Sequence, residues 1–189
     1  MKKIGIFGGT FDPIHHAHLI LARDALEALD LERVIFVPAS VSPHKLDQAL
    51  TPPDIRQEMV DAAIENEPGF ASDAMDLQRP PPSYAIDTIE ALRRREPDAE
   101  FFYFIGEDHV ARLPTWHRFA ELSEKVRFVV LHRSGGTAEH PYPAIKRRLD
   151  ISATNIRNRV ATGRSIRYLV PPAVETIIRD RQLYREMQK

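Results

Sequence analysis

Four short apolar runs constrain the fold of this 189-residue chain more than any other feature of its sequence. They span residues 4–7, 34–37, 101–105 and 126–131, and they are rich in β-branched or aromatic side chains. Runs of this length and composition are typical of strands that are buried on both faces of a parallel sheet. We therefore expect four strands in one buried, mainly parallel sheet.

Stretches with helical spacing of apolar side chains alternate with these runs. They cover residues 19–29, 55–64 and 84–95, and a further helix is expected where two prolines at 171–172 open residues 173–178. This alternation predicts a Rossmann-like, doubly wound α/β fold with helices on both faces of the sheet. Ligands of such sheets bind beyond the carboxyl ends of the strands, so we expect the site residues in the loops that follow the strands.

The composition predicts one globular domain over residues 1–189. The chain is 43% hydrophobic and 28% charged, which is ordinary for a domain of this size. The three prolines at 80–82 and the small polar residues 134–137 are interpreted as local loops, because too little chain follows the second loop to build another domain.

Charge and composition also set aside several classes of protein. The net charge of -1 gives no general attraction to nucleic acid or to an anionic membrane. The first apolar run ends after four residues, so no export signal is expected, and no apolar stretch approaches the length of a membrane span. Because there is no cysteine, disulfides and thiolate sites are excluded. We expect a cytoplasmic protein without nucleic-acid or membrane partners, and the sequence leaves a homo-oligomer open.

The turn after the first apolar run has the composition of a phosphate-binding loop. It reads Gly-Gly-Thr-Phe-Asp-Pro-Ile-His over residues 8–15, and a helix is expected to begin within or just after the histidines. Gly8 and Gly9 allow backbone N–H groups to approach a phosphate, and the helix N-terminus adds partial positive charge. His15 and His18 would face the same side of that helix.

Two other interpretations of this turn remain open on the residues alone. The histidines could cap a structural turn, or they could ligate a metal, since imidazole pairs are common metal ligands. A helix N-terminus attracts anions and repels cations, which favours phosphate over metal. The spacing matches neither the three-glycine dinucleotide motif nor a P-loop.

These residues resemble the histidine motif of the nucleotidyltransferase superfamily, in the form found in bacterial nicotinate mononucleotide adenylyltransferases. Residues 151–157, Ile-Ser-Ala-Thr-Asn-Ile-Arg, resemble the family's Ser-Ser/Ala-Thr-x-Ile-Arg motif, and Gly-Glu-Asp at 106–108 resembles its Gly-x-Asp motif. Other segments stand in the family's order, so that the resemblance covers nearly the full chain: Pro43-His44-Lys45, Arg79 with Pro82-Ser83-Tyr84, Pro114-Thr115-Trp116, and Tyr168-Leu169-Val170-Pro171.

The chain departs from the family pattern at three positions. Ala17 stands where glycine is usual, Ala85 where threonine is usual, and Ser134 where proline is common. None of these changes removes a charge. Ala17 adds a methyl group close to the expected nucleotide, and Ala85 lacks a hydroxyl that could contact the acceptor, although its backbone N–H could still serve.

The resemblance implies transfer of the adenylyl group of ATP to nicotinate mononucleotide, a step of NAD biosynthesis that releases pyrophosphate. It implies Mg²⁺ carried mainly by ATP, and we assign no protein ligand to a metal. The acid form of the acceptor is expected to be preferred over nicotinamide mononucleotide. The residues assigned are His15, His18 and Arg157 for catalysis; Gly8, Gly9, Thr10, Phe11, Gly106, Asp108, Ser152 and Thr154 for ATP; and Lys45, His44, Ser83, Tyr84, Ala85 and Trp116 for the acceptor.

Each assignment has a plainer structural alternative. Thr154 could cap a helix that begins near Asn155, with Ser152 facing a phosphate or capping in its turn. Asp108 could also be a helix cap, Lys45 a surface lysine, and Trp116 a half-buried packing residue.

Three rival functions are compatible with parts of the pattern. The same chemistry could act on another phosphate, such as pantetheine phosphate, because the two main motifs define only the ATP half. The chain could also bind a nucleotide without turnover, or be a fragment of an aminoacyl-tRNA synthetase, although it lacks a basic surface for RNA.

Overall fold

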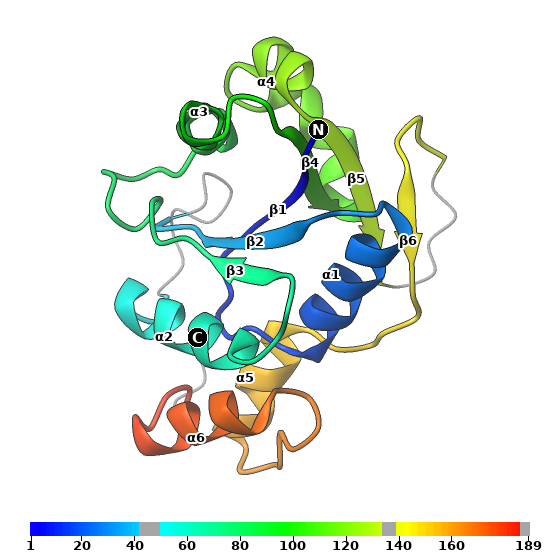
Figure 1. Ribbon diagram of the computed structural model, residues 1–189. Coiled ribbons are helices and arrows are strands. Elements are labelled where there is room, and N and C mark those ends of the chain that lie inside the picture. The colour runs from blue at the N-terminus through cyan, green and yellow to red at the C-terminus, as the bar shows by residue number, and fades with distance from the viewer. Residues whose placement is uncertain (42–49, 134–138, 186–189) are drawn as a thin grey trace.

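The computed structural model describes residues 1–41, 50–133 and 139–185. Its centre is a six-stranded sheet with the order β3-β2-β1-β4-β5-β6, in which every neighbouring pair of strands is parallel (Figure 1). The strands are β1 (Lys3–Gly9), β2 (Arg33–Pro38), β3 (Phe70–Ser72), β4 (Glu100–Gly106), β5 (Arg127–His132) and β6 (Ala144–Lys146). The four strands expected from the apolar runs are confirmed, and the two edge strands β3 and β6 are additional.

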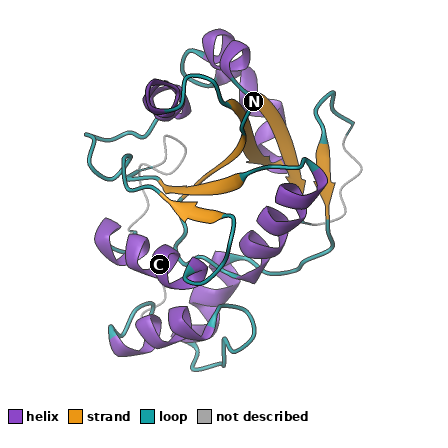
Figure 2. Cartoon of the chain, viewed as in Figure 1, coloured by secondary structure: helices purple, strands orange, loops and turns teal. Residues whose placement is uncertain are grey.

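Helices cover both faces of this sheet, which confirms the doubly wound α/β fold (Figures 1 and 2). One face carries α1 (His16–Ala28), α2 (Pro53–Ile64), α5 (Ala153–Ala161) and α6 (Pro172–Asp180). The other face carries α3 (Ala85–Arg95), the 3₁₀ helix η1 (Glu107–Thr115) and α4 (Phe119–Lys125). The described helices include the four expected from the sequence.

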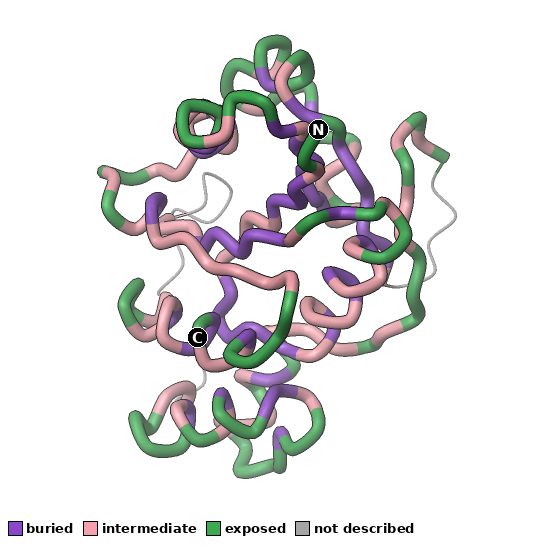
Figure 3. The backbone as a smooth tube through the Cα atoms, viewed as in Figure 1, coloured by how far each residue is buried: buried purple, intermediate pink, exposed green. Residues whose placement is uncertain are grey.

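The core lies in two layers, one on each side of the sheet, because successive side chains of a strand point to opposite faces. On β4, Phe102 and Phe104 pack with α1 and α2, whereas Phe101, Tyr103 and Ile105 pack with α3. The strands therefore read as continuous apolar runs, and their backbone is largely buried (Figure 3).

The order of the strands places a crevice beside β1. From β1 the chain adds β2 and then β3 on one side, and later β4, β5 and β6 on the other. The loops that leave β1 and β4 therefore diverge, and ligands of open parallel sheets bind at such a switch point.

Candidate active site

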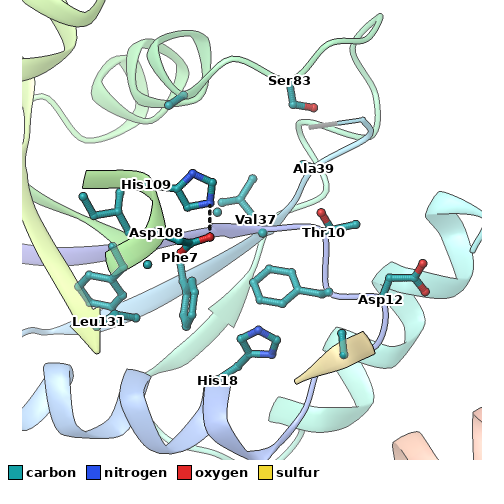
Figure 4. A pocket seen from close by; sticks show the side chains of 18 of the residues that line it. Phe7, Thr10, Asp12, His18, Val37, Ala39, Ser83, Asp108, His109 and Leu131 are labelled. Atoms are coloured by element: carbon teal, nitrogen blue, oxygen red, sulfur yellow. Dashed lines mark ion pairs between the residues drawn. The ribbon is translucent and has the colours of Figure 1, made fainter. Parts of the chain in front are cut away.

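A cavity of about 780 Å³ opens at the carboxyl ends of the strands, in the size range of small-molecule sites (Figure 4). Figure 4 shows His18 rising from α1 towards the loop after β1, with Asp108 and His109 on the far side of the cavity. The assigned residues that line it are Gly8, Gly9, Thr10, Phe11, His15, His18, Ser83, Tyr84, Ala85, Gly106, Asp108, Trp116, Ser152, Thr154 and Arg157. His44 and Lys45 lie outside the described residues.

The two motif histidines form a fixed pair at the start of α1. His15 is the N-cap residue, with extended backbone angles, and His18 is the third residue of the helix. Their rings stack with centroids 3.7 Å apart and an interplanar angle of 15°. The backbone N–H of His15 donates to Nδ1 of His18 over 3.2 Å. An Nδ1 atom that accepts a hydrogen bond carries no proton, so the proton of the neutral His18 ring is on Nε2.

The ring of His15, which stacks on that of His18, is fully buried and uncharged. Burial is the main cause that lowers the pKa of His15 to about 3, and the charge of Arg133 lowers it further. His16, between the two, does not line the cavity.

The loop after β1 is held in place by the side chains of Asp12 and Arg157. Asp12 is buried, and its two carboxylate oxygens accept from the N–H of Thr51 (3.1 Å) and the hydroxyl of Tyr184 (2.5 Å). Arg157 donates to the backbone carbonyl of Asp12 over 2.8 Å and lines the cavity. Asp12 thus acts within the loop, while Arg157 is placed to act both on the loop and on a ligand.

A buried arginine that was not anticipated from the sequence supports the same loop. The guanidinium of Arg56 on α2 is fully buried and donates to four backbone carbonyls, those of Thr51, Thr10, Ala39 and Ser40, at 2.7 to 2.9 Å. Burial lowers its pKa from the ordinary value. The loops after β1 and β2 are thereby joined by one side chain.

A second helix N-terminus faces the cavity at α5. Ser152, not Thr154, is the cap: its backbone is extended, and its hydroxyl accepts from the N–H of Asn155 over 3.2 Å. The expectation that Thr154 caps this helix was wrong, because the helix begins at Ala153 and Thr154 lies inside its first turn. Thr154 instead accepts from Arg157 over 3.3 Å.

The loop after β4 supplies the other end of the cavity. Gly106 caps η1, and a Cβ atom at this position would lie 2.4 Å from Oδ1 of Asp108. A side chain at 106 would therefore displace Asp108, whose carboxylate is exposed and lies 3.7 Å from Nε2 of His109. His109, Arg112 and Arg133 also line the cavity, and they were not assigned a role from the sequence.

The described residues assigned to the acceptor lie at the start of α3 and directly after η1. Ser83 accepts from the N–H of Ser40 over 3.0 Å, which ties the start of α3 to the loop after β2. Tyr84 is the N-cap of α3, and its ring lies 4.3 Å from that of His117. Trp116 is half-buried and lines the cavity, with the rings of Tyr103 and His109 at 6.0 Å and of Phe128 at 6.4 Å, all in edge contact.

In residues 1–41, 50–133 and 139–185, no group of three or more histidine, cysteine or acidic side chains could hold a metal ion. None of the helices in these ranges is both long enough and apolar enough to cross a membrane.

Comparison with known proteins assigns this chain to a family. The model of the cytidylyltransferase-like family matches residues 6–159. The chain is 45% identical over 187 residues to a probable nicotinate-nucleotide adenylyltransferase of Geobacillus thermodenitrificans, with 97% of this chain and 87% of the relative covered. It is 36% identical over 187 residues to the nicotinate-nucleotide adenylyltransferase of Bacillus subtilis, with 97% and 99% covered.

Solved structures share the fold. The nicotinic acid mononucleotide adenylyltransferase of Plasmodium falciparum, complexed with NaAD, superposes with a TM-score of 0.81 over 100% of both chains at 20% identity. A structure of the same protein complexed with APC gives a TM-score of 0.78 at 20% identity, again over 100% of both chains. The extent of the sequence matches shows that this chain belongs to the cytidylyltransferase-like family and, within it, to the nicotinate-nucleotide adenylyltransferases.

Proposed function

We propose that this protein transfers the adenylyl group of ATP to the 5′-phosphate of nicotinate mononucleotide, giving nicotinate adenine dinucleotide and pyrophosphate, a step of NAD biosynthesis. The observation that carries the proposal is the His15–His18 pair, because its hydrogen bond leaves the proton of the His18 ring on Nε2, and both residues line the cavity. The N-termini of α1 and α5 lie at the same cavity. Family membership over nearly the full chain supports the choice of substrates.

The chemistry needs no general base. The second ionisation of a phosphate monoester lies near pH 6, so the acceptor is largely a dianion at neutral pH. One of its oxygens forms a bond to the α-phosphorus of ATP, while the bond from that phosphorus to the bridging oxygen of the β-phosphate breaks and pyrophosphate leaves. His15, with a pKa of about 3, would be a weak base, which agrees with a role for the pair in binding rather than in proton transfer.

The main task of the site is to align two anionic groups and to offset the charge that develops on them. His18 can donate from Nε2 to the triphosphate, and Arg157 adds a fixed positive charge. The first turn of α5 adds N–H donors beside the cap formed by Ser152. Each of these groups is held by contacts within the protein, so little reorganisation is required when the charge shifts.

Magnesium enters this proposal as an ion bound to the triphosphate. Both carboxylate oxygens of Asp12 already accept hydrogen bonds, and the described residues fit an ion held mainly by ATP and water better than one held by a protein cage. When bound, the ion would neutralise charge on the phosphates.

Recognition of the acceptor is proposed for the other end of the cavity. Trp116 offers an indole face or edge to a pyridine ring, and the start of α3 at Ser83, Tyr84 and Ala85 offers N–H and hydroxyl donors to a carboxylate. His44 and Lys45 are proposed to contact the acceptor phosphate.

The proposal is tested by measuring pyrophosphate release from MgATP with three separate acceptors: nicotinate mononucleotide, nicotinamide mononucleotide and phosphopantetheine. Release is expected to be fastest with nicotinate mononucleotide, and about 10²- to 10³-fold slower in the His18→Ala variant. Faster release with either other acceptor would contradict the choice of acceptor, and binding of ATP without release for any acceptor would contradict the function as an enzyme.

A further inference from the structure

One buried carboxylate in the wall of the cavity has no role in the chemistry described above. Asp76 lies between β3 and α3, is 6% exposed, and lines the cavity. A buried negative charge is costly unless it is paired, because it is removed from water. In a site for two anionic substrates it also repels phosphate.

The pairing is local and engages one oxygen. Oδ1 of Asp76 accepts from the hydroxyl of Thr88 over 2.7 Å and from the guanidinium of Arg79. Arg79 also donates to Thr88 over 2.9 Å, which fixes the three side chains relative to one another. In the part of the chain that the structure describes, no hydrogen bond involves Oδ2. The carboxylate is thus rigidly oriented, and one of its oxygens has acceptor capacity to spare.

Asp76 lies between the two ends of the acceptor subsite. Tyr103 connects these ends, since a Cβ atom on Gly8 would lie 2.6 Å from its hydroxyl and its ring meets Trp116 in edge contact at 6.0 Å. Asp76 and Tyr103 both line the cavity, and the charge of Asp76 adds to the effect of burial in raising the pKa of the Tyr103 phenol. Through Thr88 it is also joined to α3, one turn beyond Tyr84. Asp76 therefore lines the same cavity as the loop after β1 and Trp116, on the wall that also carries Tyr103 and the start of α3.

A mononucleotide that spans this subsite places its ribose in the same stretch. Its phosphate lies at one end and its pyridine ring at the other, and the hydroxyl groups of the sugar between them are hydrogen-bond donors. We propose that Oδ2 of Asp76 accepts a hydrogen bond from a ribose hydroxyl of the acceptor nucleotide, and that this contact selects ribonucleotide acceptors. The inference rests on the proposed function and adds a specificity-determining residue to it.

A carboxylate selects in a way that a neutral group does not. It accepts a strong, charge-assisted bond from a hydroxyl, but it repels a fluorine atom of similar size, which cannot donate. The wild-type protein should therefore use nicotinate mononucleotide at least about 10-fold better in kcat/KM than the 2′- or the 3′-deoxy-fluoro analogue, whichever replaces the contacted hydroxyl.

The Asp76→Asn variant distinguishes this role from a purely structural one. Arg79 and Thr88 should hold the amide oxygen in the place of Oδ1, so the NH₂ group would face the cavity and could donate to either oxygen or fluorine. Turnover of the parent acceptor should fall, and its preference over the fluorinated analogue should shrink to about 3-fold or less, with KM for ATP unchanged. Asp73→Asn is the matched control, because Asp73 lies on the same segment, pairs with Arg95 and does not line the cavity.

The outcomes separate this inference from the function on which it rests. Equal use of hydroxyl and fluorine acceptors by the wild type, at normal turnover of nicotinate mononucleotide, would overturn the ribose contact alone. An equal loss by Asp76→Asn on all acceptors would do the same, because a structural defect does not depend on the acceptor. Failure of the wild type to use nicotinate mononucleotide at all would overturn both proposals. If the variant fails to fold, the wild-type comparison can still overturn the ribose contact.

Discussion

The backbone N–H of His15 donates a hydrogen bond to Nδ1 of His18 over 3.2 Å, beneath a stacked contact between the two rings at 3.7 Å. This bond fixes the tautomer of the His18 ring, and the stacked ring of His15 helps to hold its direction. The N-cap residue of α1 thus orients the donor that lies one turn further along the same helix. The residue spacing of the motif, three positions, is the spacing that brings the two side chains together on a helix.

Replacement of His18 should lower turnover more than it lowers stability. His18→Ala removes the proposed donor to the developing charge and is expected to reduce kcat about 10²- to 10³-fold. His18→Gln should lose less, because its amide N–H can occupy part of the space of Nε2–H. Steady-state pyrophosphate release measures both. His16→Ala is the control, since His16 does not line the cavity; a comparable loss in that variant would indicate a structural effect instead.

His15 should make the protein less stable as the pH falls below neutrality. In the unfolded chain His15 binds a proton below about pH 6.5, whereas the folded ring stays neutral down to about pH 3. Between these values the unfolded state binds one more proton, so the free energy of unfolding falls by about 1.4 kcal/mol per pH unit from this group alone. Urea unfolding of wild type and His15→Phe between pH 7 and pH 5 measures the contribution.

The free energy of unfolding should change less steeply with pH in His15→Phe than in the wild type, by the equivalent of about one bound proton. His16→Ala should keep the wild-type contribution of His15, because the His15 ring remains buried. Identical slopes in wild type and His15→Phe would show that the buried ring titrates normally.

Arg56 should be more important to stability than any exposed arginine. Arg56→Met leaves four backbone carbonyls without the donor that Arg56 supplies and is expected to lower the free energy of unfolding by about 3 to 5 kcal/mol. Arg56→Lys should recover only part of this, because an ammonium group cannot reproduce the planar fork. Arg179→Met, at an exposed ion pair with Asp180, should change stability by less than about 0.5 kcal/mol in the same urea titration.

The activity should depend on Mg²⁺ that is bound to ATP, and not on an ion that is bound stoichiometrically to the protein. Chelation of divalent ions with EDTA should abolish pyrophosphate release. Added Mg²⁺ should restore the rate as the concentration of the MgATP complex rises. Metal analysis of the purified, nucleotide-free protein tests the same point. One tightly bound equivalent of metal per chain, needed for activity, would contradict the proposal that ATP carries the ion.

The fold was predictable because its strands are buried on both faces. Four strands and the helices between them leave a continuous apolar or amphipathic pattern that can be recognised in the sequence. The edge strands β3 and β6 have three residues each and are at most half-buried, so they are too short to show a period.

The contacts that support the site were harder to predict from the sequence. Arg56 contacts a residue 46 positions away, and Tyr184 contacts Asp12 over 172 positions. One signal for Arg56 was present: it shares a helix face with Met59 and Val60, so it occupies a position in an apolar stripe. The choice between Ser152 and Thr154 as helix cap depended on whether the helix begins at Ala153 or at Asn155, a difference of two residues that propensity does not settle.

The fate of the α-phosphate tests adenylyl transfer most directly. ATP radiolabelled at its α-phosphate is incubated with the wild-type protein, Mg²⁺ and nicotinate mononucleotide, and the products are separated and counted. The label should appear in a dinucleotide in a one-to-one ratio with released pyrophosphate, and His18→Ala should slow both equally. Label that remains in ATP, or that appears as AMP without a dinucleotide, would contradict the proposed reaction.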